Sequence, residues 1–455
     1  MLSLKDKKFL LIGDYDCDGI CSTAITKRLL EKLDIKHNFY IPSRSKDGYG
    51  LNMDMVNMAK DNGFEVILSV DNGISAYEAI DLANSYGIKV LIIDHHEYLK
   101  EPDCFGYIHP SLLQKDYQNL SAGGLSYLFS TLFYDDTLSL VYGGLATLAD
   151  MVGVLGFNRY MLKETRKILN EGHIYQINLL NESDEYDYDS LSFNVIPKIN
   201  SISRMEYNAN IMVKYLLADK ETCLNTINQI NAINEERKAL TSKLVKEAGR
   251  LIDRERKVAV IISEKFTEGT CGLLANRLVH SSDKPVIVLA KKDGILKGSC
   301  RSPEGFNMYE YLCGIKEVFE LFGGHEQACG VSIKEENLEK LFEYIDNSSF
   351  ENKEVVKDAI KVSSDELNYN LFLKLEELKP FGTDLKEPLL VIENVEYIER
   401  KLAANKYPKF ILNGDVSAIS FNTNYANKEF KDMIGHLKKD NFYRNKASFV
   451  IEDLR

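Results

Sequence analysis

The sequence predicts an α/β fold with a parallel sheet in its N-terminal part. Continuous apolar runs recur at residues 7–16, 64–73 and 88–97, and each is followed by turn residues and an amphipathic segment. Uninterrupted hydrophobicity, rather than alternation of apolar and polar residues, is typical of strands that are buried on both faces. The length of 455 residues exceeds that of one ordinary core, so we expect two to four domains.

The composition is that of a globular protein without a membrane span. Hydrophobic residues make up 45% of the chain and charged residues 27%. No apolar stretch approaches the roughly 20 residues that cross a bilayer, and the N-terminus lacks the cleavage site of a secretory signal, so we expect a cytoplasmic protein that does not bind membranes. The eight cysteines contain no Cys-x-x-Cys pair, which favours free thiols. The net charge of −12 argues against a protein that coats polyanions but allows a local basic groove.

Acidic residues and histidines follow the predicted strands. A fourth, largely apolar segment, residues 140–153, also carries one acid, where a solvated carboxylate is unusual. Because the ligand crevice of an open parallel sheet lies outside the carboxyl ends of its strands, we expect these side chains to meet. An isolated acid at such a place is more often a helix N-cap or a turn former, and a histidine pair is more often a hydrogen-bonded pair at the surface or in the core. Here, however, four segments carry such residues, which favours a shared site. The residues are Asp14, Asp16, Asp18, Asp71, Asp94, His95, His96 and Asp150.

Carboxylates and imidazoles without thiolates suit manganese or magnesium. The acids are numerous enough for two cations that share a bridging aspartate. Two such ions, about 4 Å apart, lower the pKa of a bound water and stabilise the attacking and leaving oxygens of a phosphoryl displacement. The pattern therefore predicts a two-metal phosphodiesterase.

Four short motifs carry a family resemblance. The segments DYDCDG, VDNG, DHH and LAD resemble, in order and spacing, the four metal-binding motifs of the DHH phosphoesterase superfamily. Within it, the chain is similar to RecJ-type single-stranded-DNA exonucleases along nearly its whole length, through residues 41–52, 121–129 and 196–205. The resemblance implies a metal-dependent exonuclease that hydrolyses phosphodiester bonds of single-stranded DNA from 5′ to 3′ in DNA repair and recombination. It also implies single-stranded-DNA-binding protein or a helicase as candidate partners.

The resemblance assigns roles to the clustered side chains. We expect Asp71, His95 and His96 to be catalytic, with Asp71 bridging two cations, Mn²⁺ or alternatively Mg²⁺. Neighbouring side chains of a strand diverge, so His96 should face the scissile phosphate rather than duplicate His95. The expected metal ligands are Asp14, Asp16, Asp18, Asp71, His95 and Asp150.

The local patterns and the resemblance together divide the chain into four parts. Residues 1–204 form a DHH catalytic domain. Residues 205–256 have apolar residues at helical spacing and no glycine before Gly249, and they form a helical connector. Strand and helix patterns then resume, so residues 257–350 form a second α/β domain, the DHH-associated substrate-binding domain. Short alternating runs predict a small β-barrel at residues 370–455, an OB-like nucleic-acid-binding domain.

Basic residues and glycines in the segments that resemble RecJ are the expected substrate contacts. Guanidinium groups suit phosphates, and a glycine pair lets the backbone approach a ligand closely. This set is Arg44, Arg204, Arg277, Arg301, Ser302, Gly323, Gly324 and His325. In the OB-like part, Tyr407, Phe410 and Phe421 are candidate platforms for base stacking, although we expect at least two of them to pack in the core.

The chain departs from the RecJ pattern at three places. Thr267 stands where a histidine is usual, and Leu385 stands where an asparagine is usual. The first motif begins at residue 14, whereas RecJ proteins carry several dozen residues before it. These departures bear on the substrate contacts and on any channel wall that such an extension supplies.

Two other functions stay open. A short-oligonucleotide or cyclic-dinucleotide phosphodiesterase would share both DHH lobes but would not need a barrel after residue 370. A non-catalytic DHH-type nucleic-acid-binding component would have lost metal ligands, whereas every ligand position that can be matched is filled here.

Overall fold

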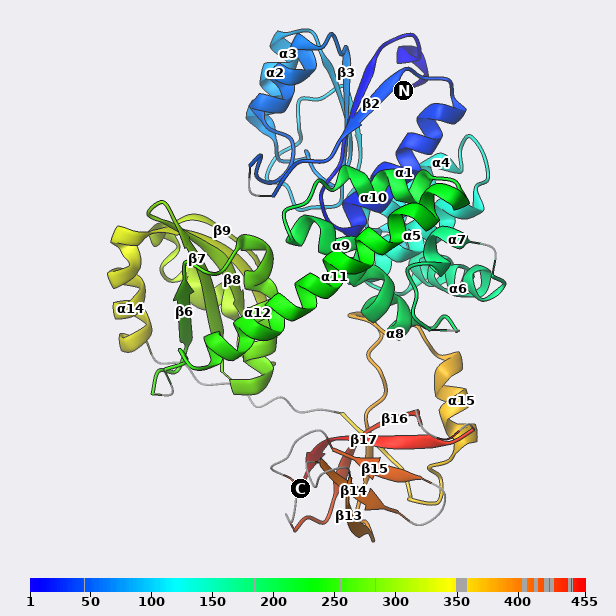
Figure 1. Ribbon diagram of the computed structural model, residues 1–455, viewed down its shortest axis with the longest axis vertical. Helices are drawn as coiled ribbons and strands as arrows, with labels where there is room; N and C mark the ends of the chain where they lie inside the picture. The colour runs from blue at the N-terminus through cyan, green and yellow to red at the C-terminus, as the bar shows by residue number, and fades with distance from the viewer. Residues whose placement is uncertain are drawn as a thin grey trace. The chain divides into compact units, whose positions relative to one another are not determined.

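The computed structural model divides the chain into two compact units, Met1–Glu354 and Val355–Arg455, which we describe separately (Figure 1). No helix among the described residues is long and apolar enough to cross a membrane. The described residues are 1–44, 46–172, 174–183, 185–253, 255–282, 284–348, 358–402, 407–412, 416–420, 425, 429–440, 443 and 445–455.

The N-terminal sheet is parallel throughout, as predicted. The strand order is β2-β1-β3-β4-β5. Because β2 lies on one side of β1 and β3 lies on the other, the order reverses at β1, and this reversal makes a crevice at the carboxyl ends of β1 and β3. The three predicted apolar runs form β1, β3 and β4. The strands are β1 (Phe9–Ile12), β2 (His37–Tyr40), β3 (Val66–Val70), β4 (Lys89–Ile93) and β5 (Gly106–Ile108).

Helices cover both faces of this sheet, which is why its strands are apolar at successive positions. Along β1, Phe9 and Leu11 pack in one core with α1, α4 and α5, whereas Leu10 and Ile12 pack in the other core with α2 and α3. The helices are α1 (Cys17–Lys32), α2 (Met53–Asp61), α3 (Tyr77–Ser85), α4 (Ala122–Ser130), α5 (Thr137–Ala149) and α6 (Gly156–Asn170).

A helical region follows the sheet and ends in the long helix α11. A π-helical turn, Leu191–Val195, joins α8 to α9. Asp219 caps α11, because its carboxylate accepts a hydrogen bond from the Thr222 amide at 2.8 Å. The helices are α7 (Tyr175–Asn178), α8 (Tyr188–Ser190), α9 (Ile196–Arg204), α10 (Asn210–Leu217) and α11 (Lys220–Gly249). The 3-10 turns of the first unit are Leu2–Leu4, Pro110–Leu112, Lys115–Tyr117, Lys316–Val318 and Glu335–Asn337.

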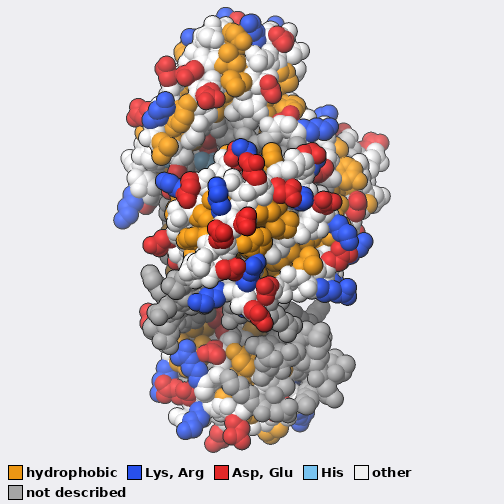
Figure 2. Space-filling model, turned by 90° about the vertical axis from the view of Figure 1, so that its left-hand side faces the viewer, with side chains coloured by type: hydrophobic (Ala, Val, Ile, Leu, Met, Phe, Trp, Pro, Cys, Tyr) orange, Lys and Arg blue, Asp and Glu red, His pale blue; other side chains and the backbone are white. Residues whose placement is uncertain are grey.

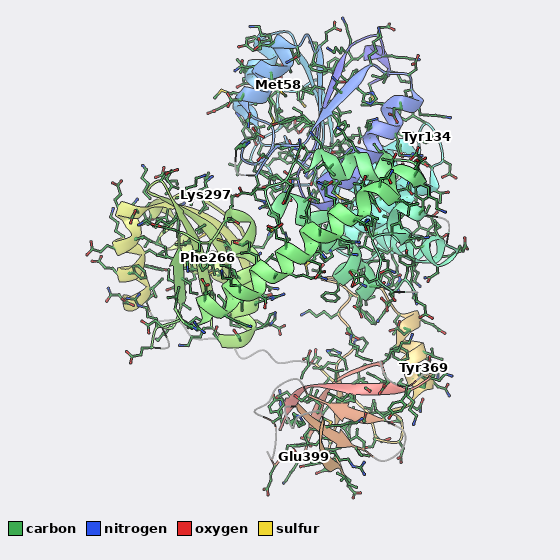
Figure 3. All side chains as sticks on the ribbon, in the orientation of Figure 1. Met58, Tyr134, Phe266, Lys297, Tyr369 and Glu399 are labelled. Atoms are coloured by element: carbon green, nitrogen blue, oxygen red, sulfur yellow. The ribbon has the colours of Figure 1, made fainter. Side chains whose placement is uncertain are left out.

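A second, mixed sheet follows α11 in the order β6-β7-β8-β10-β9. The β6 and β7 strands are parallel and the other pairs are antiparallel. Phe266, labelled in Figure 3, is buried in the core between this sheet, α11 and α12. The elements are β6 (Ala259–Ser263), α12 (Glu268–Ser282), β7 (Val286–Lys292), β8 (Ile295–Arg301), α13 (Met308–Cys313), β9 (Phe319–His325), β10 (Ala328–Lys334) and α14 (Leu338–Asn347).

The second unit contains a seven-stranded sheet in the order β11-β12-β16-β17-β15-β14-β13. Phe410 is fully buried in its core against the rings of Tyr397 and Phe430, so it is not available for base stacking. Phe421 lies outside the described residues, and so does the side chain of Tyr407. The elements are β11 (Ile360–Lys361), α15 (Tyr369–Glu377), β12 (Leu390–Ile392), β13 (Ile398–Leu402), β14 (Tyr407–Ile411), β15 (Ser417–Ile419), β16 (Met433–Lys439) and β17 (Ala447–Leu454).

Charges of both signs lie on the face of the molecule that Figure 2 shows. On the face of the molecule shown in Figure 2, acidic and basic side chains are interspersed rather than gathered into one basic area. This distribution agrees with the net charge of −12. Contacts with a polyanion must therefore come from a few local basic groups.

Candidate metal centre

The first motif places three aspartates around the start of α1. Asp14 follows β1 and is buried. Asp16 is the N-cap of α1, and its Oδ1 accepts hydrogen bonds from two amides of the first turn at 2.9 and 3.1 Å. The buried carboxylate of Asp18 accepts hydrogen bonds at 2.9 and 2.7 Å from the two amides that begin α4. Asp16 thus has the helix-capping role that is expected of an isolated acid at this position. Capping uses only one of the two carboxylate oxygens of Asp16.

Asp71 follows β3 in a left-handed backbone conformation, with φ of 62°. Such a conformation costs a non-glycine residue on the order of 1–3 kcal/mol, so other bonds must hold it. Asn72 supplies them, because its Oδ1 accepts hydrogen bonds from the Ser69 hydroxyl at 2.6 Å and from the Leu51 amide at 2.9 Å. The turn fixes the buried Asp71 carboxylate at the carboxyl edge of the sheet.

Asp94 orients the two histidines that follow it. Its Oδ1 accepts hydrogen bonds from the His95 amide at 2.7 Å and from His96 Nδ1 at 2.7 Å, and its Oδ2 accepts one from the Ile74 amide at 3.0 Å. Burial opposes charge on both partners, but their contact lowers the pKa of Asp94 and raises the pKa of His96 to about 9. Asp94 is therefore an ionised positioning residue whose oxygens already have partners.

Side chains of three other segments converge on His95. Its Nε2 lies 3.3 Å from Asp71 Oδ1 and 3.7 Å from Asp18 Oδ2, and its Nδ1 lies 3.6 Å from Asp150 Oδ2, at the end of α5. Three overlapping groups of side chains could each hold a cation, and Asp71 and His95 each belong to two of them. The groups are Asp14, Asp16 and Asp71; Asp71, His95 and His96; and Asp18, His95 and Asp150.

Burial and mutual repulsion govern the protonation of this cluster. Burial, followed by the charge of Asp16, raises the pKa of Asp14 to about 8 and that of Asp150 to about 7. Burial and the neighbouring carboxylates raise the pKa of Asp18 and of Asp71 well above the usual range. The cluster therefore needs protons or cations to balance its charge.

Two atoms of the cluster also lack a hydrogen-bond partner. Asp14 Oδ1 and His95 Nε2 are buried and have none among the described residues. Such orphaned atoms are rare in native proteins unless an ion or a water binds them. A carboxylate and imidazole donor set of this kind fits a divalent cation such as Mn²⁺ or Mg²⁺.

Arginines gather beside the Asp14 and Asp16 end of the cluster. Arg44 lies over the ring of Tyr15, 4.1 Å from its centroid, and its Nε is buried without a hydrogen-bond partner among the described residues. Burial, with the charges of Arg44 and then of other arginines, lowers the pKa of Arg204 to about 10. Gly269 lets α12 approach the end of α9, because a Cβ there would lie 2.6 Å from the Arg204 carbonyl oxygen.

The structure brings some of the expected substrate contacts together and leaves others apart. Arg301 acts electrostatically on Arg204, and so belongs to the arginine cluster. Ser302 is buried and its hydroxyl donates a hydrogen bond to the Phe306 carbonyl at 2.7 Å. Gly323, Gly324 and His325 lie on the exposed edge strand β9, with no hydrogen bond or ion pair between His325 and the acidic cluster in the described part of the chain.

Two residues beside the centre were not predicted from the sequence. Arg237 of α11 is buried, held by Asn234 Oδ1 at 2.9 and 3.1 Å, and acts on both Arg204 and Arg277. Tyr49 is 55% exposed, and its hydroxyl lies 3.0 Å from His96 Nε2. The flanking glycines of the Gly-Tyr-Gly segment, both at positive φ, are the one sequence signal for Tyr49, whereas Arg237 has none.

Family models match three successive parts of the chain. The model of the DHH family, N-terminal domain, matches residues 8–147, the DHHA1 domain matches residues 255–348, and the RecJ OB domain matches residues 359–453. Residues 8–147 therefore resemble the N-terminal domain of the DHH family. The parallel N-terminal sheet and the match of residues 359–453 to the RecJ OB domain confirm the predicted fold class, including an OB-like C-terminal part.

Curated relatives of this chain include proteins named RecJ. It is 29% identical to the single-stranded-DNA-specific exonuclease RecJ of Bacillus subtilis over 88% of this chain and 54% of the relative. It is 28% identical to RecJ of Escherichia coli over 84% of this chain and 74% of that protein. The chain thus spans about half the length of the Bacillus subtilis relative.

Solved structures share the fold. RecJ of Thermus thermophilus in complex with Mn²⁺ superposes with a TM-score of 0.84 at 22% identity, over 99% of this chain and 69% of that one. A second structure, exonuclease RecJ bound to manganese, has a TM-score of 0.65 at 24% identity, over 77% of this chain and 93% of that one. At these identities the likeness shows the fold alone.

Proposed function

We propose that this protein is a metal-dependent exonuclease that hydrolyses phosphodiester bonds of single-stranded DNA from the 5′ end. The observation that carries the proposal is the overlap of three candidate cation groups on Asp71 and His95 at the carboxyl edge of the sheet. Relatives named single-stranded-DNA-specific exonuclease support the substrate, and the RecJ OB domain supports a strand-binding role for residues 370–455.

The proposed ligands are the six residues expected from the motifs. Asp71 would bridge two cations, and His95 would complete the second group. Structures of RecJ solved with Mn²⁺ and with Mg²⁺ support a divalent cation, and we propose two, with Mn²⁺ preferred. Bound cations would lower the pKa of an attacking water and stabilise charge on the phosphate oxygens. The ligands are Asp14, Asp16, Asp18, Asp71, His95 and Asp150.

The remaining side chains would bind and orient the strand. His96 is protonated at neutral pH, because its contact with Asp94 outweighs burial, and its imidazolium can donate a hydrogen bond to a phosphate oxygen. Arg44 and Arg204 would bind a neighbouring phosphate. We extend the proposed contacts to Arg277, Arg301, Ser302, Gly323, Gly324 and His325, in the part that the DHHA1 model matches or beside it.

We propose that the parts of the chain delimited from the sequence have different roles. Residues 1–204 would carry catalysis, residues 205–256 would connect, and residues 257–350 would hold the substrate. Single-stranded-DNA-binding protein or a helicase would be partners in repair and recombination, in the cytoplasm. The RecJ OB domain argues against a phosphodiesterase of short oligonucleotides or cyclic dinucleotides, and the filled ligand set argues against a non-catalytic component.

Digestion of end-labelled strands tests the proposal. Single-stranded DNA and RNA labelled at the 5′ or 3′ end are incubated with the chain and Mn²⁺ or Mg²⁺. We expect mononucleotides to leave the 5′ end of DNA, and no product from duplex DNA. Release from the 3′ end would refute the polarity, hydrolysis of dinucleotides alone would favour the small-substrate enzyme, and strand binding without hydrolysis would favour the non-catalytic component.

A further inference from the structure

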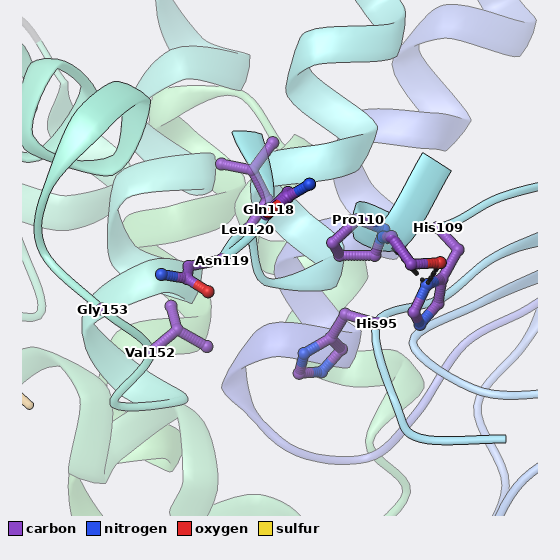
Figure 4. Close-up of a pocket in the computed structure, with 9 residues that line it drawn as sticks. His95, His109, Pro110, Gln118, Asn119, Leu120, Val152 and Gly153 are labelled. Carbon is purple, nitrogen blue, oxygen red and sulfur yellow. Dashed lines mark hydrogen bonds between the residues drawn. The ribbon is translucent and has the colours of Figure 1, made fainter. Parts of the chain in front are cut away.

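A cavity of about 600 Å³ opens beside His95. This volume lies within the range of roughly 300–1,000 Å³ that sites for small ligands occupy. In the view of Figure 4, Asn119 and Val152 lie on one side of it and His109 on the other, with His95 between them. The cavity therefore adjoins a proposed metal ligand.

The lining of the cavity is uncharged apart from any charge on its two histidines. None of the nine described residues that form it is an aspartate, glutamate, lysine or arginine. Ser111, Gln118 and Asn119 present neutral hydrogen-bonding groups, and Val152 presents apolar surface. Phosphates are usually held by cationic groups, whereas a base and a sugar need neutral donors, acceptors and apolar contacts. The lining thus suits the nucleoside part of a nucleotide.

Hydrogen bonds hold the walls of the cavity in place. The buried Asn158 donates from Nδ2 to the carbonyls of Asn119 at 2.7 Å and of Gly153 at 2.6 Å, and so joins two walls. On the opposite side, His109 Nε2 donates to the carbonyl of His96 at 3.1 Å. Because these backbone segments are already held, a ligand binds with a smaller entropy cost than if the walls had to be ordered.

The cavity and the arginines adjoin different residues of the metal centre. The charges of Arg44 and Arg204 act on Asp14 and Asp16. The cavity is instead lined by His95, whose Nδ1 lies 3.6 Å from Asp150 Oδ2. A phosphodiester held at the centre would therefore have both a cationic region and a neutral cavity beside it.

We propose that this cavity is a nucleoside subsite: it binds the base and sugar next to the phosphate at the metal centre, while the arginines bind backbone phosphate. The inference rests on the proposed function and names one subsite of it. Asn119 offers an amide donor and an acceptor, and Gln118 offers its acceptor and the N–H that does not donate to the Leu113 carbonyl, which Nε2 contacts at 3.2 Å. Every base can use such groups. The subsite would therefore accept any of the four bases.

Calorimetric titration of the Mn²⁺-loaded full chain tests this subsite. The ligands are thymidine 5′-monophosphate and, separately, inorganic phosphate. We expect the nucleotide to bind about tenfold more tightly than phosphate, since the cavity adds hydrogen bonds and apolar contact. The double variant Gln118→Leu/Asn119→Leu should lose this preference and keep its affinity for phosphate and Mn²⁺. Both side chains are exposed, so the substitutions leave the core intact.

Gln114→Leu is the matched control. Gln114 is exposed on the same segment and does not line the cavity, so its variant should keep the preference for the nucleotide. Equal affinity of the unaltered chain for nucleotide and phosphate would overturn the subsite, and so would a preference that survives in the double variant. Degradation of single strands by the unaltered chain is measured in parallel, so failure of the exonuclease proposal is seen separately from failure of the subsite.

Discussion

At the scale of residues, two adjacent histidines differ in protonation. Burial and the charge of His96 lower the pKa of His95 to about 4, whereas Asp94 raises the pKa of His96 to about 9 against the effect of burial. A neutral imidazole can coordinate a cation, and an imidazolium can donate to a phosphate oxygen. The two adjacent residues are thus suited to separate roles.

Substitution of Asp71 tests whether this residue bridges two cations. The left-handed backbone at this residue makes Asp71→Asn preferable to an alanine variant, because asparagine tolerates positive φ. We expect hydrolysis to fall about a thousandfold or more, because loss of the bridging charge removes several kcal/mol of transition-state stabilisation. Calorimetry with Mn²⁺ should show weaker binding, and circular dichroism an unchanged fold. Near-normal turnover would exclude Asp71 as the bridge.

Paired substitutions separate the roles of the histidines. His96→Gln should lower turnover much more than Mn²⁺ occupancy, because His96 is proposed to face the phosphate. His95→Gln should lower both, because His95 belongs to two of the candidate cation groups. Turnover and bound manganese are measured for both variants. An equal loss of manganese in the two variants would contradict this distinction.

Metal-free protein should lose stability as the pH rises from about 6.5 to 8.5. Asp14 and Asp150 have folded-state pKa values of about 8 and 7, above the ordinary 3.8, so the folded state binds more protons than the unfolded state in this range. Their contribution is fully present below the ordinary pKa and is lost as the pH rises through the folded values. Thermal unfolding in a chelator should show a falling Tm.

Asp150→Asn is the control for this pH dependence. Removing one titrating carboxylate should flatten the slope of Tm against pH. Adding Mn²⁺ to the unaltered chain should raise Tm more at pH 8.5 than at pH 6.5, because deprotonated ligands bind cations. A metal-free Tm that rises over this range would refute the assigned direction of these pKa values.

At the scale of elements, close approach of helices positions the motif residues. An ideal Cβ on Gly19 of α1 would lie 2.5 Å from Asp14 Cβ, so only glycine lets α1 begin directly beneath the end of β1. A Cβ on Gly123 of α4 would lie 2.3 Å from Ala146 Cβ and 3.1 Å from Asp18 Oδ1. Glycines thus bring three elements to the cluster of acids.

Gly19→Ala measures the importance of this contact. The added methyl must push α1 away from Asp14, so we expect a loss of about 1–3 kcal/mol in the free energy of unfolding and weaker Mn²⁺ binding. Gly249→Ala at the end of α11 has no heavy atom within 4 Å of its Cβ, and it should change stability by no more than about 1 kcal/mol, with unchanged Mn²⁺ binding. Chemical denaturation gives both values. Equal behaviour of the two variants would refute the packing argument.

At the scale of the whole molecule, the chain separates into two compact units with their own cores. All candidate metal ligands and the arginine cluster belong to Met1–Glu354, and the RecJ OB domain belongs to the other unit. Hydrolysis of the phosphodiester bond and binding of a long DNA strand can therefore be tested separately.

A chain truncated after residue 354 should still cleave short oligonucleotides but bind long single strands less tightly. It keeps the proposed catalytic groups and loses the strand-binding surface that the OB domain is proposed to supply. Affinity for a long strand is measured against salt concentration, and the slope should be modest because few cationic contacts carry binding. If the soluble truncated chain degrades long strands as well as the full chain, the OB domain has no role in holding DNA.

The sequence by itself determined the parallel sheet and the meeting of the acids. Uninterrupted apolar runs require cover on both faces, and side chains after parallel strands share one edge, so Asp14, Asp71 and His95 could be brought together without coordinates. These inferences depend on local periodicity and on the direction of neighbouring strands.

Only the tertiary structure decided which groups already have partners. The amides that bind Asp18 are 104 and 105 positions away, so the sequence could not show that its oxygens are engaged. Arg237 joins the arginines because α11 packs beside α9, and Asn158 joins two walls of the cavity that are separate in sequence. Hydrogen bonding, burial and pKa depend on such distant approaches, which local sequence patterns do not encode.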